Sequence, residues 1–105
     1  MNEELMKKRA TEIKNKIIEA YNNSNLDSFI FEEQVEIRKN SNGNLSRIIF
    51  QVSTPYIYLD FDGEYKGRIV ALGYPPQLEV SPIPLEIWWK IEPILEEIIE
   101  EYFIN

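Results

Sequence analysis

The chain has 105 residues, of which 44% are hydrophobic and 12% aromatic, and its formal charge at pH 7 is −7. This size and composition are typical of one globular domain, residues 1–105. The chain contains neither cysteine nor histidine, which excludes thiolate and imidazole catalysis and the usual zinc sites. No apolar run approaches the roughly 20 residues that cross a bilayer. We therefore expect a soluble, cytoplasmic protein without a cofactor.

The negative charge also bears on partners. Nucleic-acid binding gains free energy by neutralising phosphates with Lys and Arg, and anionic membranes attract basic segments. We therefore expect no direct binding to nucleic acid or membrane, and a basic protein surface as the favoured partner. The alternative is that the charge only keeps a small domain soluble, since net charges of about 2–8 are ordinary.

The first predicted element is a helix over residues 3–22. Leu5, Ile13, Ile17 and Tyr21 follow the four-residue spacing of one helix face. The polar run of Asn and Ser after Tyr21 ends the pattern.

Four segments then alternate between apolar and polar side chains, which is the period of a half-buried strand. They are residues 29–38, 46–52, 56–61 and 65–72. The apolar face of the first is formed by Phe29, Phe31, Val35 and Ile37. Between the last two segments, Asp62-Gly63 is a dipeptide that favours a two-residue hairpin turn. The segments are therefore expected to form an antiparallel meander.

A second helix is predicted over residues 82–103. Ser81 would be its N-cap and Pro82 its first residue. Its apolar stripe consists of Trp88, Ile91, Leu95, Ile98 and Tyr102. Pro93 has no N–H to donate to the carbonyl of Trp89, so we expect a kink or a break there.

These elements predict an α+β fold in which both terminal helices pack on one face of a four-stranded sheet. The other sheet face would be exposed and amphipathic. Its members would be Tyr56, Tyr58, Asp60, Glu32, Glu36, Arg38 and Arg47.

Three acidic residues around the Asp-Gly dipeptide form a weak candidate metal site. Hard cations such as Ca²⁺ prefer several neighbouring carboxylates, and Asp60, Asp62 and Glu64 supply them. However, the twelfth position of a calcium loop would be Ala71, which offers no ligand. The favoured interpretation is a turn with acidic flanks, and we expect neither a metal nor catalysis by paired carboxylates, which requires a deep cleft.

The end of the second helix is crowded with carboxylates. They are Glu92, Glu96, Glu97, Glu100 and Glu101. Carboxylates near a helix C-terminus oppose the helix dipole, and like charges four residues apart repel. This unfavourable arrangement suggests that the residues bind a basic partner. The alternative is a solvated face, which is the usual role of a charge run.

Aromatic side chains offer contact area for such a partner. Trp88 and Trp89 lie about 100° apart around a helix, so only Trp88 fits the inner stripe. Exposed Trp89, with Tyr56 and Tyr58 on the sheet, would then contribute interface energy. Alternatively, Trp89 packs under the loop at residues 74–76, or its patch mediates homodimerisation.

The resulting hypothesis is a non-catalytic acidic protein-binding module. We expect a small inhibitor or immunity-type protein, of bacterial or phage origin, that occludes the basic, nucleic-acid-binding surface of a target and so counteracts a defence system. An oligomeric structural or chaperone-like adaptor is the alternative, and a carboxylate enzyme with a divalent metal is the third hypothesis.

Overall fold

The computed structural model describes residues 3–74 and 77–103. Three helices accompany one five-stranded antiparallel sheet, in which neighbours in the sequence are also neighbours in space, in the order β1-β2-β3-β4-β5. The elements are α1 (Glu3–Asn22), α2 (Leu26–Glu33), β1 (Glu36–Lys39), β2 (Leu45–Gln51), β3 (Tyr56–Asp60), β4 (Arg68–Leu72), β5 (Leu78–Pro82) and α3 (Leu85–Tyr102). The predicted α+β class and antiparallel meander are confirmed, with one strand more than expected.

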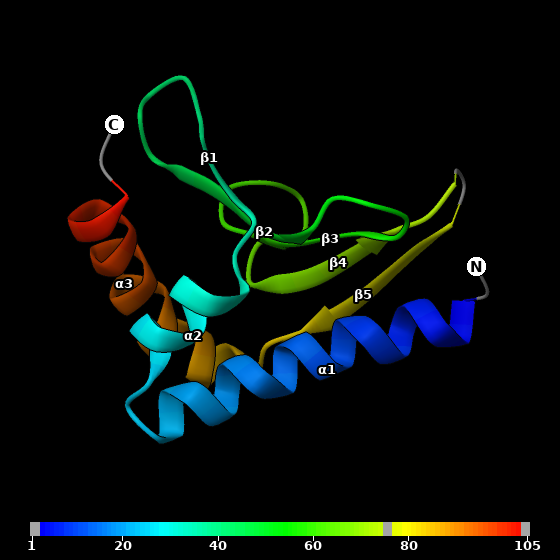
Figure 1. Cartoon of the computed structure of the whole chain (residues 1–105), viewed down its shortest axis with the longest axis horizontal. Coiled ribbons are helices and arrows are strands. Elements are labelled where there is room, and N and C mark those ends of the chain that lie inside the picture. The colour runs from blue at the N-terminus through cyan, green and yellow to red at the C-terminus, as the bar shows by residue number, and fades with distance from the viewer. Residues whose placement is uncertain (1–2, 75–76, 104–105) are drawn as a thin grey trace.

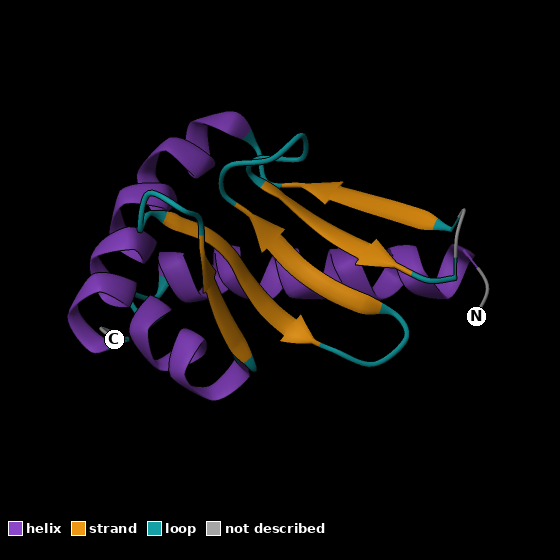
Figure 2. Cartoon of the chain, turned by 90° about the horizontal axis from the view of Figure 1, so that it is seen from above, coloured by secondary structure: helices purple, strands orange, loops and turns teal. Residues whose placement is uncertain are grey.

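The helices pack against the sheet in two places. α1 runs lengthwise beneath β4 and β5, while α2 and α3 lie together at one end of the molecule (Figures 1 and 2). Polar contacts fix α1 on β5: Nζ of Lys7 donates to the carbonyl of Val80 at 2.6 Å, and the hydroxyls of Thr11 and Ser81 lie 3.3 Å apart. None of the described helices is long and apolar enough to cross a membrane.

One apolar core lies between the helices and the facing side of the sheet. α1 contributes Met6, Ala10 and Ile17, which are fully buried and follow the helical period. The cross-strand row of Ile48, Leu59 and Ile69 supplies the sheet side. Because α2 and α3 contribute to the same cluster, all three helices share this core.

The prediction of a strand over residues 29–38 was wrong for its first half. Residues 26–33 form α2, and only Glu36–Lys39 belong to a strand. Leu26, Phe29 and Ile30 are buried at positions i, i+3 and i+4, which is the spacing of a helix face. Phe31 is 49% exposed, so its apparent alternation with Phe29 did not reflect a common buried face.

The start of the last helix was also misplaced. Ser81 is not an N-cap but a buried residue of β5, where it pairs with Ile69. α3 begins at Leu85, directly after Pro84. It runs as one helix through Pro93, so a break at that proline is excluded, whereas a bend there stays a prediction.

The sheet face turned away from the helices is less open than predicted. Ile49, Tyr58 and Val70 form a second, smaller buried cluster on it, in one cross-strand row. Asp60 is buried as well. Glu32, which was assigned to this face, lies on α2 instead. Glu36 and Arg38 are exposed and Arg47 is half-buried.

Candidate protein-binding face

The outward face of α3 combines an apolar half with an acidic half. Its inner face is fixed by Trp88, Ile91, Leu95, Ile98 and Ile99, all buried. With about 100° between successive residues, the opposite side carries Leu85, Trp89 and Pro93, together with the exposed charged residues Glu86 and Lys90, and then the glutamates of the C-terminal half. Leu85 is 57% and Trp89 67% exposed. Trp89 is therefore mostly exposed, while residues 75 and 76 of the loop that was the alternative cover for it lie outside the described residues.

The glutamates of α3 fall into two groups. Glu92 is half-buried, and its Oε2 lies 3.2 Å from Nζ of Lys66. Glu96, Glu97, Glu100 and Glu101 are exposed, and none of them forms an ion pair with another described residue. The acidic half of the face therefore consists of these four residues, which we call the acidic crest.

The acidic crest is electrostatically unfavourable within the monomer. The last turn of α3 contains no basic residue, so the carboxylates face the negative end of the helix dipole without compensation. Glu96 and Glu100 repel each other at a spacing of four residues, as do Glu97 and Glu101. Among the described lysines and arginines, none forms an ion pair with these four carboxylates.

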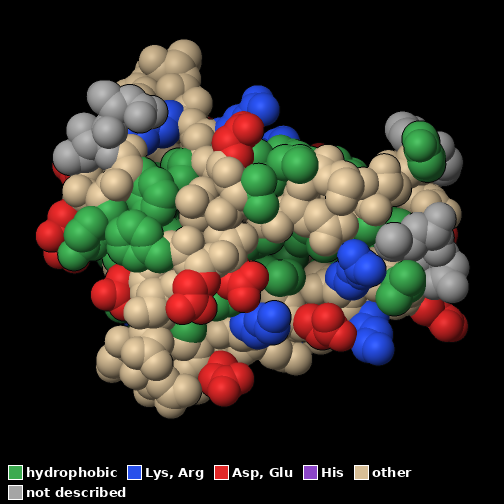
Figure 3. Space-filling view, in the orientation of Figure 1, with side chains coloured by type: hydrophobic (Ala, Val, Ile, Leu, Met, Phe, Trp, Pro, Cys, Tyr) green, Lys and Arg blue, Asp and Glu red, His purple; other side chains and the backbone are tan. Residues whose placement is uncertain are grey.

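Each side of the acidic crest borders a concavity. Glu96 and Glu100 line a cleft of about 600 Å³ between α3, the β1–β2 turn and the β3–β4 loop, and Asp62, Lys39 and Lys66 are also among its lining residues. Glu97 and Glu101 line a groove of about 380 Å³ between α3 and the α1–α2 junction, which also includes Ile94, Tyr21 and Tyr102. Figure 3 shows hydrophobic side chains exposed at this end of the molecule, with acidic side chains around them.

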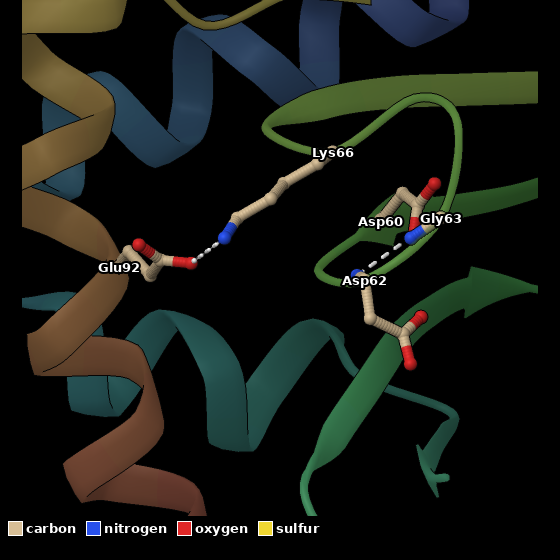
Figure 4. Close-up of polar contacts among 5 residues, drawn as sticks. All are labelled: Asp60, Asp62, Gly63, Lys66 and Glu92. Carbon is tan, nitrogen blue, oxygen red and sulfur yellow. Dashed lines mark hydrogen bonds and ion pairs between the residues drawn. The ribbon is translucent and has the colours of Figure 1, made fainter.

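The weak candidate metal site is a structural loop. β3 and β4 are joined by residues 61–67, and the carboxylate of Asp60 accepts hydrogen bonds from the backbone N–H groups of Asp62, Gly63 and Tyr65 at 2.8–3.2 Å. Figure 4 shows the carboxylate of Asp62 pointing away from that of Asp60. No three acidic side chains within residues 3–74 and 77–103 are grouped as a metal would require.

The Asp-Gly dipeptide does not form the predicted two-residue turn. A type I′ turn would require a positive φ at both Asp62 and Gly63. Among the described glycines, only Gly43 and Gly67 have a positive φ. The loop instead closes at Gly67, whose N–H donates to the carbonyl of Asp60 at 2.9 Å. Glycine suits position 63 for another reason: a Cβ there would lie 2.6 Å from Oδ2 of Asp60.

Asp62 connects the loop to the β1–β2 turn. Nδ2 of Asn40 donates to its Oδ2 at 3.0 Å, and the hydroxyl of Ser46 donates to its Oδ1 at 2.8 Å. The hydrogen bond from Asn40, followed by that from Ser46, lowers the pKa of Asp62. The two turns that flank the cleft therefore hold each other in place.

The two sheet tyrosines have different environments. Tyr58 is 4% exposed, and the guanidinium carbon of Arg47 lies 4.0 Å from its ring centroid. Burial raises the pKa of Tyr58, while the positive charge of Arg47 acts in the opposite direction. Tyr56 is half-buried, with its ring 5.4 Å from that of Tyr58. Because its ring is covered, Tyr58 offers almost no surface to a partner, and we do not include it in the candidate face.

No protein-family model, curated protein or solved structure matches the chain.

Sequence reasoning missed the residues that shape the cleft. Asn40, Ser46 and Lys66 are separated from their partners by 16 to 26 positions in the chain. Single polar residues so far apart in the chain form no repeating pattern from which their contacts could be predicted. Tyr102 was assigned to the apolar stripe of the helix, yet it is 53% exposed, and Ile94 is 38% exposed.

Proposed function

We propose that this chain is a non-catalytic acidic module that binds the basic surface of a partner protein through the outward face of α3. The single observation that supports it most is the acidic crest. Its four carboxylates are exposed at the unfavourable end of a helix, and none of them forms an ion pair with a described lysine or arginine. A basic partner would supply the missing compensation.

The same face also exposes the apolar side chains of Leu85 and Trp89, which would add contact energy to the electrostatic attraction. Leu85 is 57% and Trp89 67% exposed, and Trp is one of the residue types that contribute most to interface energy. Carboxylates beside them would accelerate association with a positive surface and fix its orientation. The arrangement therefore combines steering with contact area.

The class of target follows from the chemistry of the acidic crest. A row of carboxylates on a rigid helix presents the kind of charge that phosphates present to a nucleic-acid-binding protein. A partner that binds phosphates with Lys and Arg would have its site occluded by this face. We therefore propose an inhibitor or immunity-type role, which fits a cytoplasmic protein of bacterial or phage origin.

The test uses two matched variants as bait in quantitative capture from a bacterial lysate. The first replaces Glu96, Glu97, Glu100 and Glu101 by Gln. The second replaces Glu3, Glu4, Glu12 and Glu19 by Gln, which are exposed on α1 and change the net charge by the same amount. We expect basic proteins to be retained by the native chain and the α1 variant, and lost with the α3 variant.

Two results would contradict the proposal. Equal loss with both variants would show that net charge, and not this face, holds the captured proteins. Equal retention with both would show that the acidic crest is solvated surface only. The association rate of a captured partner should also fall steeply as ionic strength rises, whereas binding through apolar contacts alone would be insensitive to salt.

A further inference from the structure

The two edges of the sheet differ in accessibility. α1 lies alongside the β5 edge, and Nζ of Lys7 donates a hydrogen bond to the carbonyl of Val80. Pro82, also in β5, has no N–H to donate to a further strand. At the β1 edge, Glu36, Arg38 and Lys39 are all exposed, and no further strand of the described chain pairs beyond it. An exposed edge presents N–H and C=O groups to another strand. β1 is therefore the edge that can be extended.

A groove accompanies the β1 edge. It has a volume of about 450 Å³ and lies between β1 and the end of α3, with Val35, Ile37, Tyr102 and Phe103 among its lining residues. Val35 is 54% and Tyr102 53% exposed. The ring of Phe31 lies 5.1 Å from that of Tyr102 and extends this apolar surface. A strand added at β1 would therefore find a place for apolar side chains.

The charges of β1 complement those of a second, antiparallel copy of the same strand. If a twofold axis passes through Ile37, Glu36 of each copy faces Arg38 of the other. Opposite charges directly across two strands are stabilising, and like charges are destabilising. In the monomer these two residues already contact each other through Nε of Arg38 and Oε2 of Glu36, so both side chains lie on the same face of the strand.

We propose that β1 pairs antiparallel with β1 of a second copy of this chain, joining the two sheets into one. Glu36 and Arg38 form two reciprocal ion pairs on one face of the new ladder. On the other face, Val35 and Ile37 of each copy approach the groove of its neighbour. The register shift between Arg38 and Lys39 limits the paired segment to this short stretch. The interface is isologous and uses no residue of the acidic crest.

Charge reversal tests the register directly by sedimentation equilibrium. Glu36→Arg places Arg opposite Arg, and Arg38→Glu places Glu opposite Glu, so each variant alone should dimerise about tenfold more weakly than the native chain. An equimolar mixture of the two restores opposite charges at both pairs and should form a heterodimer. The double variant Glu36→Arg/Arg38→Glu should recover the native dimerisation constant.

Glu12→Arg, at an exposed site on α1, is the control for net charge and should dimerise as the native chain does. Far-UV circular dichroism of each variant establishes that the exposed substitutions leave the fold intact. A native chain that remains monomeric at millimolar concentration would overturn the proposal. So would unchanged dimerisation of both single variants, or a mixture that associates no better than either variant alone.

Discussion

Lys66 joins the β3–β4 loop to the middle of α3, where its Nζ lies 3.2 Å from Oε2 of Glu92. Glu92 is the most N-terminal of the five glutamates identified in the sequence and the one that is partly buried. It forms an ion pair within the molecule, while the four that follow form none with a described residue. The outward face of α3 therefore becomes acidic one turn later than the sequence suggested, and Glu92 is a structural residue in this arrangement.

Breaking this pair should destabilise the domain modestly. Because Lys66 is more than half exposed, we expect Lys66→Met to lower the free energy of unfolding by about 0.5–1 kcal/mol. Urea denaturation of the native chain, Lys66→Met, Glu92→Gln and the double variant gives the coupling energy between the two side chains. A coupling energy indistinguishable from zero would show that the contact does not hold the loop on the helix.

Replacing Glu96, Glu97, Glu100 and Glu101 by Gln should leave the fold intact and raise its stability. Removing negative charge from the end of α3 relieves dipole and i,i+4 repulsion, with an expected total gain of about 1 kcal/mol at low salt. Replacing Glu3 and Glu4 by Gln should have the opposite sign, because those residues lie in the first turn of α1. Thermal denaturation at low and high salt measures both. Destabilisation by the α3 variant would refute the repulsion argument.

Asp60 should be the carboxylate whose loss damages the fold most. It is 3% exposed and accepts three backbone hydrogen bonds. Asp60→Ala leaves these donors unpaired, and we expect a loss of about 3 kcal/mol in the free energy of unfolding. Asp60→Asn, which retains one acceptor oxygen, should lose less. Equal stability of the alanine variant and the native chain would mean that the loop finds other acceptors.

Asp62 should make stability depend on pH in acid. Hydrogen bonds from Asn40 and Ser46 hold its pKa below the ordinary 3.8. The stabilisation is therefore present above pH 3.8 and is lost as the pH falls through the lower pKa of the folded state. Asn40→Ala removes one of these hydrogen bonds and should therefore make the free energy of unfolding depend less on pH in this range. Unfolding free energies of both proteins across the acid range provide the measurement, and identical slopes would contradict the assignment.

Elements fixed by short-range patterns were predictable from the sequence, and elements fixed by long-range contacts were not. α1 matches its predicted range, because one long periodic stripe is unambiguous. α2 was missed because eight residues can satisfy a period of two and a period of 3.6 equally well, and which face is buried decides between them. β5 was missed because Ser81 and the prolines that follow it also resemble a helix start. Its identity as a strand depends on pairing with β4.

The sequence by itself determined the class of fold, the antiparallel meander and the accumulation of negative charge on the last helix, since each is expressed in neighbouring residues. The tertiary structure decided which charges are compensated and which aromatic rings are exposed. Glu92 acquired a partner from a loop 26 residues away, Tyr58 was covered by Arg47, and Trp89 was left exposed. The physical reason is that burial and ion pairing depend on distances between elements, which only the packing of the whole chain establishes.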